Sequence, residues 1–397
     1  MKKRIMILGA SILQLPAIQK AKEMGLEVIA VDMDRNAVGF KQADICLPIS
    51  TIDIPGVVAA AKEYKVKGVM TLASDMPMRT VAAVAKECGL VGIDMDTAQK
   101  ATNKAIMRQC LKEHGVPIPH FCKVTSEREY YSAIKEFDGR FIVKPADNSG
   151  SRGVYLVESG NDSTQVNMAF VHSKAYSRSG DIVVEEFMEG PEVSVETLSL
   201  DGKVHVVQIT DKLTTGAPFF VEMGHSQPTQ LSAAVAKDIR RVATMAVEAI
   251  GIKDGPSHTE IKVTNEGAKI VELGARLGGD CITTHLVPLS TGVDMVKCCI
   301  LIALGENVDI AQKYTKGAAV RYFYSHAGEL RGITGVKAAE SEPGIKQVSI
   351  VKNIGDILTN IESSTDRAGF VIAQADNAKE AVAAAERGRS LISLDIC

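Results

Sequence analysis

Short apolar runs alternate with helical patterns along residues 1–96, and this alternation constrains the fold more than any other feature of the chain. The apolar runs at residues 4–8 and 27–31 have the composition of buried strands, and residues 15–24 between them have the spacing of a helix. Strands joined in this way run parallel, and their helices cover both faces of the sheet. We therefore expect a parallel α/β domain over residues 1–96.

Two residues at the ends of these strands are typical of nucleotide-binding α/β domains. Gly9 follows the first strand and Asp32 follows the second, as in the dinucleotide-binding Rossmann fold. The Gly-x-Gly-x-x-Gly pattern is nevertheless absent, because Ser11 stands where the second glycine belongs. The pattern therefore predicts a Rossmann-like domain and disfavours an NAD-dependent oxidoreductase.

The pattern changes after this first domain. A helix is expected over residues 97–114, which places Lys104 and Arg108 on one face because they are four residues apart. From residue 130 onward, helical patterns mix with short strands, which indicates an antiparallel α+β arrangement. The strands expected there include residues 141–144, 181–187, 193–200 and 205–210. The 397 residues allow two or three domains, and we expect three, at residues 1–96, 97–313 and 314–397.

Charge and composition exclude several classes of partner. The chain has 45 Lys+Arg against 48 Asp+Glu, a formal net charge of -3, so no basic surface for nucleic acid or for an anionic membrane is predicted. The apolar run at residues 5–8 is too short for a signal peptide, and no stretch has the length of a spanning helix. The 8 cysteines lack a Cys-x-x-Cys pair, which argues against a zinc site and for a cytoplasmic location.

A glycine-rich stretch follows the strand expected at residues 141–144. Lys144 and Pro145 end this strand, and the chain then reads Ala-Asp-Asn-Ser-Gly-Ser-Arg-Gly up to Gly153. Backbone N–H groups of such a loop can bind an anion, and Lys144 and Arg152 can reach phosphate oxygens. The Walker order is absent, and an ordinary flexible hairpin has the same composition, so this stretch alone leaves both interpretations open.

Two glutamates are expected to face each other across a hairpin. Two strands flank the turn at residues 264–267, and Glu260 and Glu272 lie at equal distances from Glu266. Like charges directly opposite each other destabilise a sheet, and burial raises that cost. A divalent cation would offset the repulsion, and oxygen ligands favour Mg²⁺ or Mn²⁺. The alternative is a solvated hairpin face with two unrelated glutamates.

The strand at residues 181–187 runs into a polar segment with a Gly-Pro break. Phe187 and Met188 could form apolar walls for an adenine ring, and Glu192 could bind a ribose. A strand followed by a turn is common, so this feature is weak by itself.

Taken in their order along the chain, these features resemble the ATP-grasp superfamily. The residues that carry the resemblance are Lys104, Val143-Lys144-Pro145, Asn148 to Gly153, Glu185-Glu186-Phe187 with Glu192, and Glu260 with Glu272-x-x-x-Arg276. The chain looks most like the carboxylate–amine ligase branch, which includes biotin carboxylase, the glycinamide ribonucleotide synthetase/formyltransferase-type enzymes and the L-amino-acid ligases. Residues 221–226 and 278–285 look most like segments of the amino-acid ligases.

The resemblance implies a fold and a set of roles. The fold would be an ATP-grasp fold with a Rossmann-like N-terminal domain and a small C-terminal α+β domain. The implied catalytic residues are Arg276, which would stabilise the acyl phosphate, and Lys144. The implied nucleotide-binding residues are Lys104, Lys144, Ser149, Gly150, Ser151, Arg152, Gly153, Glu185, Glu186, Phe187 and Glu192, with adenine held largely by backbone atoms of its strand. The implied metal ligands are Glu260 and Glu272, and the implied substrate residues are Glu222, His225, Gly278, Gly279 and His285.

Two positions complicate the resemblance. The family usually has an asparagine two residues after the second glutamate, whereas this chain has Gly274, which offers no ligand atom. Water would replace that ligand, or one of two metals would be held more loosely. His225, His258 and His285 have either structural or substrate-binding roles, and His225 and His285 are expected in glycine-containing loops.

The implied activity is formation of an amide or peptide bond by a cytoplasmic ligase. It would use ATP with Mg²⁺ or Mn²⁺, pass through an acyl phosphate and release ADP and phosphate. Its partners would be small-molecule carboxylate and amine substrates of the amino-acid type. No nucleic acid or membrane partner is expected. A homodimer is possible. The alternatives are a purine-biosynthesis ligase of the phosphoribosylglycinamide type and a degenerate ATP-binding regulatory protein.

Overall fold

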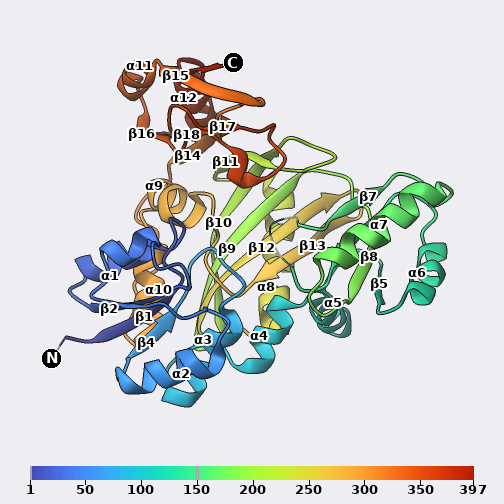
Figure 1. Cartoon of the computed structure of the whole chain (residues 1–397), viewed down its shortest axis with the longest axis horizontal. Coiled ribbons are helices and arrows are strands. Elements are labelled where there is room, and N and C mark those ends of the chain that lie inside the picture. Colours follow the sequence, from blue (N-terminus) through green and yellow to red (C-terminus); the bar gives the residue numbers. More distant parts are fainter. Residues whose placement is uncertain (1, 149, 151) are drawn as a thin grey trace.

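The computed structural model describes residues 2–148, 150 and 152–397 of the chain. Ser149 and Ser151, which belong to the expected phosphate loop, lie outside the described residues. Figure 1 shows the N-terminal α/β layers at the lower left, residues 121–187 at the right, and the C-terminal strands at the top, with a long central sheet between them. The expected combination of a parallel N-terminal sheet with antiparallel sheets further along the chain is confirmed.

The N-terminal sheet is parallel. Its strands, in sheet order, are β3 (Ile45–Leu47), β2 (Glu27–Val31), β1 (Arg4–Leu8) and β4 (Gly68–Met70). The side chains of β1 alternate, so that Ile5 and Ile7 belong to one apolar core and Met6 and Leu8 to another. The helices that cover these faces are α1 (Leu15–Glu23) and α10 (Met295–Ala303) on one side, and α2 (Ile54–Glu63) and α3 (Met78–Cys88) on the other. A short helix, η1 (Val38–Lys41), lies between β2 and β3.

Residues 121–187 form an antiparallel sheet with two helices. The strands, in sheet order, are β5 (Phe121–Val124), β8 (Ile182–Glu186), β6 (Phe141–Pro145) and β7 (Tyr155–Val157). The helical segments are α6 (Glu127–Ala133), η2 (Ile134–Glu136) and α7 (Ser163–Tyr176). Tyr130 and Phe141 are fully buried in its core, which gives this part of the chain an apolar centre of its own.

The central sheet has eight described strands. Their order is β13 (Gly267–Gly274), β12 (Gly255–Thr264), β9 (Glu192–Leu200), β10 (Lys203–Thr214), β11 (Glu222–Gln227), β14 (Gly317–Tyr322), β18 (Gly369–Ala375) and β16 (Ile345–Ile350). Helix α8 (Ala233–Ile250) packs on one face of its first four strands, where Ile261 and Ile270 are buried. The neighbouring residues of these strands point to the opposite face, which carries the polar groups described below.

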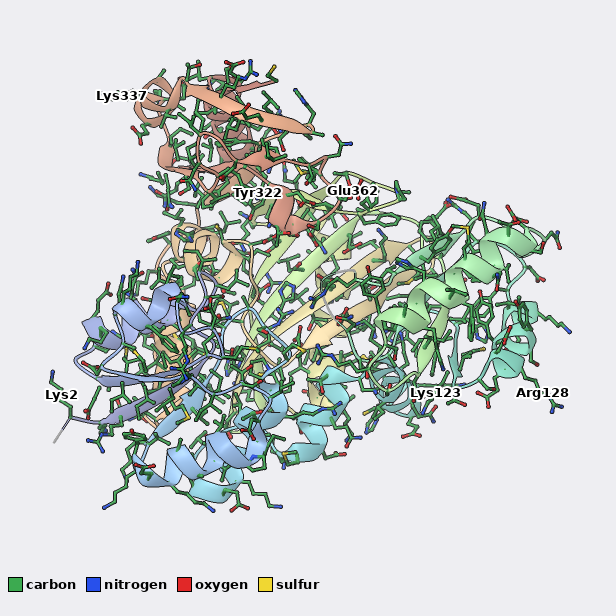
Figure 2. All side chains as sticks on the ribbon, viewed as in Figure 1. Lys2, Lys123, Arg128, Tyr322, Lys337 and Glu362 are labelled. Carbon is green, nitrogen blue, oxygen red and sulfur yellow. The ribbon has the colours of Figure 1, made fainter. Side chains whose placement is uncertain are left out.

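The C-terminal strands continue the central sheet, so hydrogen bonding crosses the boundary expected at residue 314. The other C-terminal elements are α11 (Val336–Ser341), α12 (Ala378–Ser390), η4 (Ser364–Asp366), and the small sheet of β17 (Ile357–Leu358), β15 (Gly328–Thr334) and β19 (Ser393–Ile396). Arg367 donates to both oxygens of Asp280 at 2.8 and 2.9 Å and lies 3.7 Å from the centre of the Tyr322 ring. Figure 2 shows Tyr322 where the C-terminal elements meet the rest of the molecule.

Three expectations about local structure were wrong. Residues 97–114 form two helices, α4 (Met95–Thr102) and α5 (Lys104–Glu113), because Asn103 is extended and its side chain caps α5 by accepting from the Ile106 N–H. The strand expected at residues 205–210 extends to Thr214. His225 lies on a strand, β11, and not in a loop, because β11 pairs with both β10 and β14.

The remaining helical elements follow β13. They are η3 (Ile282–Leu286), which is a π-helical turn, and α9 (Val287–Thr291). Across the described part of the chain, no single helix is long and apolar enough to span a membrane. Ile282–Thr291 and Met295–Ala303 pass that test only when joined, and they are bent by 113°.

Candidate functional site

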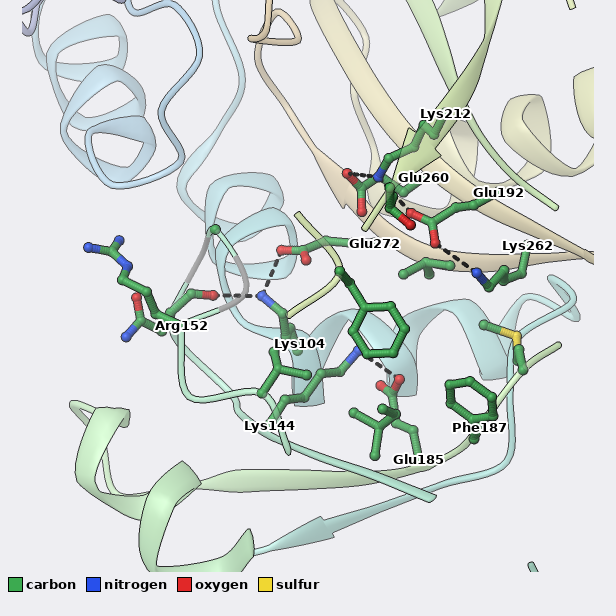
Figure 3. Close-up of a pocket in the computed structure, with 18 of the residues that line it drawn as sticks. Lys104, Lys144, Arg152, Glu185, Phe187, Glu192, Lys212, Glu260, Lys262 and Glu272 are labelled. Carbon is green, nitrogen blue, oxygen red and sulfur yellow. Dashed lines mark hydrogen bonds and ion pairs between the residues drawn. The ribbon is translucent and has the colours of Figure 1, made fainter. Parts of the chain in front are cut away.

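A pocket lies between the antiparallel sheet of residues 121–187 and the polar face of the central sheet (Figure 3). It gathers most of the predicted nucleotide and metal residues, together with one predicted substrate residue, from segments far apart in sequence. These residues are Lys104, Lys144, Gly150, Arg152, Glu185, Glu186, Phe187, Glu192, Glu222, Glu260 and Glu272. The residues Gly153, His225, Arg276, Gly278, Gly279 and His285 do not line this pocket. All these roles stay predictions.

One wall of the pocket contains a buried group of charges, Arg108, Lys144 and Glu185, which we call the Lys144 cluster. Arg108 donates to both oxygens of Glu185 at 2.7 and 3.0 Å, and Lys144 Nζ lies 2.7 Å from Glu185 Oε2. Burial alone would raise the pKa of the Glu185 carboxyl, but the two cations outweigh it and lower that pKa to about 2. The Glu185 side chain is therefore fully engaged, and only its backbone is left for a nucleotide.

The opposite wall contains a second group, Lys212 with Glu192, Glu222 and Glu260, which we call the Lys212 cluster. Lys212 Nζ lies 2.6 Å from Glu192, 3.1 Å from Glu260 and 3.5 Å from Glu222. Burial would lower the pKa of Lys212, but the three carboxylates raise it well above its ordinary value. One cation is thus shared by three carboxylates.

Sequence reasoning missed Lys212 because the strand that carries it was expected to end at Thr210. The signal was available, since Thr210 and Lys212 are two residues apart and therefore point to the same face. Had β10 been extended by one pair of residues, Lys212 would have been placed beside Glu192, whose neighbour Val193 pairs with Asp211.

Glu260 and Glu272 are directly opposite each other on β12 and β13, as predicted. The register shifts by one residue between Glu260 and Ile261, because Ile261 pairs with Ile270. This bulge brings the two carboxylates into register, since an uninterrupted ladder would place Val271 opposite Glu260. Each carboxylate contacts a lysine: Glu260 contacts Lys212, and Glu272 lies 2.6 Å from Lys104. The expected pairing therefore depends on a bulge that the simple midpoint argument did not include.

The donor set fits a divalent cation. The Glu260 and Glu272 side chains are partly open, at 26% and 30% exposure, and present carboxylate oxygens of the kind that Mg²⁺ and Mn²⁺ prefer. The described residues that line the pocket include five cationic side chains and six carboxylates. Such a lining carries a net negative charge, so a polyphosphate needs an added cation to enter it.

Steric crowding explains why glycine stands at position 274, where the family usually has asparagine. A Cβ atom at this position would lie 2.5 Å from Asp75 Oδ1 and 3.1 Å from Arg276 Nε. Arg276 donates to both oxygens of Asp75, at 2.9 and 3.1 Å. A side chain at position 274 would therefore displace an ion pair that joins the N-terminal sheet region to β13, and the predicted catalytic Arg276 is already engaged in that pair.

The predicted substrate residues are dispersed. Glu222 is in the pocket, whereas His225 is 2% exposed, with its Nε2 3.5 Å from Asp280 Oδ2. His285 was also expected in a glycine-containing loop, but this was wrong, because it lies on the π-helical turn η3, where its Nδ1 is 2.8 Å from Thr284 Oγ1. Arg367, which sequence reasoning also missed, holds Asp280 from the C-terminal side. The structure thus brings only Glu222 of this group directly to the pocket.

Several known proteins resemble this chain in sequence or in fold. A family model described as an ATP-grasp domain matches residues 137–284, and one described as L-amino acid ligase C-terminal domain 2 matches residues 321–396. The solved structure of an L-amino acid ligase from Bacillus licheniformis superposes with a TM-score of 0.86 at 22% identity, over 100% of this chain and 99% of that one. Residues 137–284 thus match the ATP-grasp domain family, and the whole chain shares the fold of the ligase structure. The predicted family and fold class are confirmed.

Curated relatives of this protein include ligases. It is 24% identical over 290 residues to the L-arginine-specific L-amino acid ligase of Bacillus subtilis, which is 70% of this chain and 68% of the relative. It is 27% identical over 254 residues to the alanine–anticapsin ligase of Bacillus subtilis (strain 168), which is 58% of this chain and 53% of the relative. The chain thus spans about half to two thirds of the length of these relatives.

Proposed function

We propose that the protein is an ATP- and Mg²⁺-dependent ligase that joins the carboxylate of one amino-acid-like substrate to the amine of another. The observation that carries this proposal is a single pocket with a positively charged buried cluster on one wall and paired, partly open carboxylates on the other. The names of the relatives as amino acid ligases support the substrate class.

The charge distribution suggests how the reactants are held. A substrate carboxylate and the γ-phosphate of ATP repel each other, so the step needs positive charge at the phosphate and exact alignment of the reacting groups. Lys144 and Lys104 are the cations of the pocket that would face the phosphates. A divalent cation at Glu260 and Glu272 would supply further charge neutralisation.

The reaction would form an acyl phosphate with release of ADP, and the amine would then displace phosphate from the acyl carbon. An acyl phosphate is hydrolysed by water, so the site needs to exclude solvent during the reaction. The described loop residues Gly150 and Arg152 line the pocket and would help to cover a bound nucleotide. Arg276, held by Asp75 at the rim of the N-terminal region, is proposed to stabilise the developing oxyanion with its planar guanidinium.

The proposal is tested by incubating the purified protein with ATP, Mg²⁺ and pairs of amino acids. We expect phosphate release that requires a particular pair, together with a product whose mass equals that of the two substrates less one water. Glu260→Gln and Glu272→Gln should abolish the release, and Glu266→Gln at the hairpin turn should not.

Other outcomes would contradict the proposal. Phosphate release only with phosphoribosylamine and glycine would support the purine-type ligase instead. Binding of ATP without turnover in any mixture would support the regulatory protein.

A further inference from the structure

Glu196 and His258 form a buried pair next to the proposed metal site. They are opposite each other on β9 and β12, and His258 Nδ1 lies 2.6 Å from Glu196 Oε1. Glu196 is fully buried, and His258 is 7% exposed. Neither residue lines the nucleotide pocket, and the proposed reaction assigns no role to either of them.

The other side of the imidazole faces a proposed metal ligand. His258 and Glu260 are two residues apart on β12, so both point to the same face of the sheet. His258 Nε2 lies 3.6 Å from Glu260 Oε1, which is the distance of an ion pair. Both neighbours of the ring are carboxylates, which only accept hydrogen bonds, so the ring offers an N–H on each side.

The pair is costly to keep in this position. A fully buried carboxylate loses its hydration, and Glu196 Oε2 has no hydrogen-bond partner among the described residues. The backbone also approaches the pair closely at Gly278. A Cβ atom there would lie 2.6 Å from His258 Nδ1 and 2.9 Å from Glu196 Oε2. Gly278, predicted from the sequence as a substrate residue, therefore leaves room for this pair.

We propose that Glu196 and His258 are positioning residues for the metal ligand Glu260. Glu196 fixes the ring orientation, and the ring holds one oxygen of Glu260 so that the other oxygen stays directed into the pocket. This arrangement corresponds to the outer partners that orient the ligands of metal sites in general. The inference rests on the proposed function, because it assumes that Glu260 binds a cation.

The chain offers a matched control for a merely structural pair. Thr197 and Ser257 are opposite each other on the same two strands, one position along, and their hydroxyl oxygens lie 2.6 Å apart and are buried. Thr197 and Ser257 are buried on the same two strands as Glu196 and His258. Their side chains point to the opposite face of the sheet, away from Glu260. Ser257→Ala should therefore affect stability without affecting metal binding.

The experiment measures Mn²⁺ binding by electron paramagnetic resonance in the presence of ADP, and ATP binding by equilibrium dialysis in EDTA. For Glu196→Gln and His258→Gln we expect Mn²⁺ dissociation constants raised about tenfold to a hundredfold, with metal-free ATP binding within about twofold of wild type. The reason is that loss of either member weakens the contact of the ring with Glu260, whose Oε1 is then held by Lys212 and no longer by an oriented imidazole. Gly278→Ala, whose Cβ would push against the ring, is a milder variant in case the others do not fold.

The results separate this inference from the proposed function. Wild type should bind Mn²⁺ and Glu260→Gln should not; if wild type binds none, the metal site and the positioning role both fail. If wild type binds Mn²⁺ but the folded Glu196, His258 and Gly278 variants bind it equally well, only the positioning role is overturned. An equal loss of Mn²⁺ affinity in Ser257→Ala would also overturn it, because the effect would then be structural.

Discussion

The two charged clusters that face each other across the pocket are built in opposite ways. In the Lys144 cluster two cations share one carboxylate, and all three side chains are almost completely buried. In the Lys212 cluster one buried cation is shared by three carboxylates, which are 21–26% exposed. The first wall therefore has an excess of positive charge, and the second has an excess of negative charge that is open to the pocket.

This difference shows how a nearly neutral protein can bind a polyphosphate. Under the proposed function, positive charge that is already paired within the protein would face the phosphates. The carboxylates on the other wall would be balanced by a cation that enters with the nucleotide. The net charge of -3 thus says little about the pocket, because charges of both signs are separated within it.

The largest effect is expected from removing the positive excess. Lys144→Met should lower kcat/KM for ATP about 10²- to 10³-fold, because a buried charge aimed at the phosphates is lost. Steady-state phosphate release measures this loss. Lys123→Met on β5, which is separated from β6 by β8 in the same sheet, serves as the control and should leave activity unchanged, because the Lys123 side chain is 50% exposed. If a folded Lys144→Met protein were as active as wild type, Lys144 would not have the proposed role at the phosphates.

The next effect concerns the stability of the negative wall. Lys212→Met should lower the free energy of unfolding by about 3–5 kcal/mol, because three carboxylates lose their common cation. Mg²⁺ with ADP should restore part of this loss, since a divalent cation replaces the missing charge. Urea unfolding with and without Mg²⁺–ADP measures both effects, and the exposed Lys203→Met on the same strand is the control. If Mg²⁺–ADP does not restore any of the lost free energy of unfolding, the carboxylates of the Lys212 cluster do not share a divalent cation.

The Lys144 cluster should also give the protein a distinct acid sensitivity. The pKa of Glu185 is lowered from 4.5 to about 2 in the folded state, so its contribution to stability is present above pH 4.5 and is lost as the pH falls toward 2. Glu185→Gln should therefore be less stable than wild type at neutral pH, and the difference should shrink between pH 4.5 and pH 2. Denaturant titrations across this range measure it, and a difference independent of pH would show that Glu185 is not ionised in this cluster.

The smallest effect is expected where neither cluster is touched. Phe187 lines the pocket, and the Arg140 guanidinium lies 4.5 Å from its ring centre. Phe187→Leu should raise KM for ATP about threefold to tenfold at nearly constant kcat, because an adenine ring loses an aromatic contact. Mn²⁺ affinity should stay at its wild-type value, and a change in it would mean that the two walls are not independent.

Much of the fold follows from local patterns. Strands β1 and β2 and helix α1 lie within one residue of their expected limits, because each has a clear apolar period. The limits of strands that depend on pairing with distant segments could not be predicted from local sequence patterns. β11 contains Gly224 and the buried polar His225, and it is a strand because partners exist on both sides. The domain limits at residues 96 and 313 stay predictions, and the continuous central sheet shows why sequence patterns define the second poorly.

The candidate site divides in a similar way. The order of Lys104, Lys144, Glu260 and Glu272 along the chain is sufficient to suggest an ATP-grasp site, because the last three lie on strands that the sequence indicates. Lys212 was missed because its strand was expected to end at Thr210, and Arg367 was missed because its partner Asp280 is brought close only by the fold.

The amino-acid order alone thus decides which side chains are available and which strands can carry them, through local propensity and the period of apolar residues. The tertiary structure decides which charges meet. Arg276 joins Asp75 across 201 positions, and Lys104 joins Glu272 across 168. Such pairs depend on how sheets pack and on a one-residue bulge in β13, and neither is encoded in the spacing of the residues concerned.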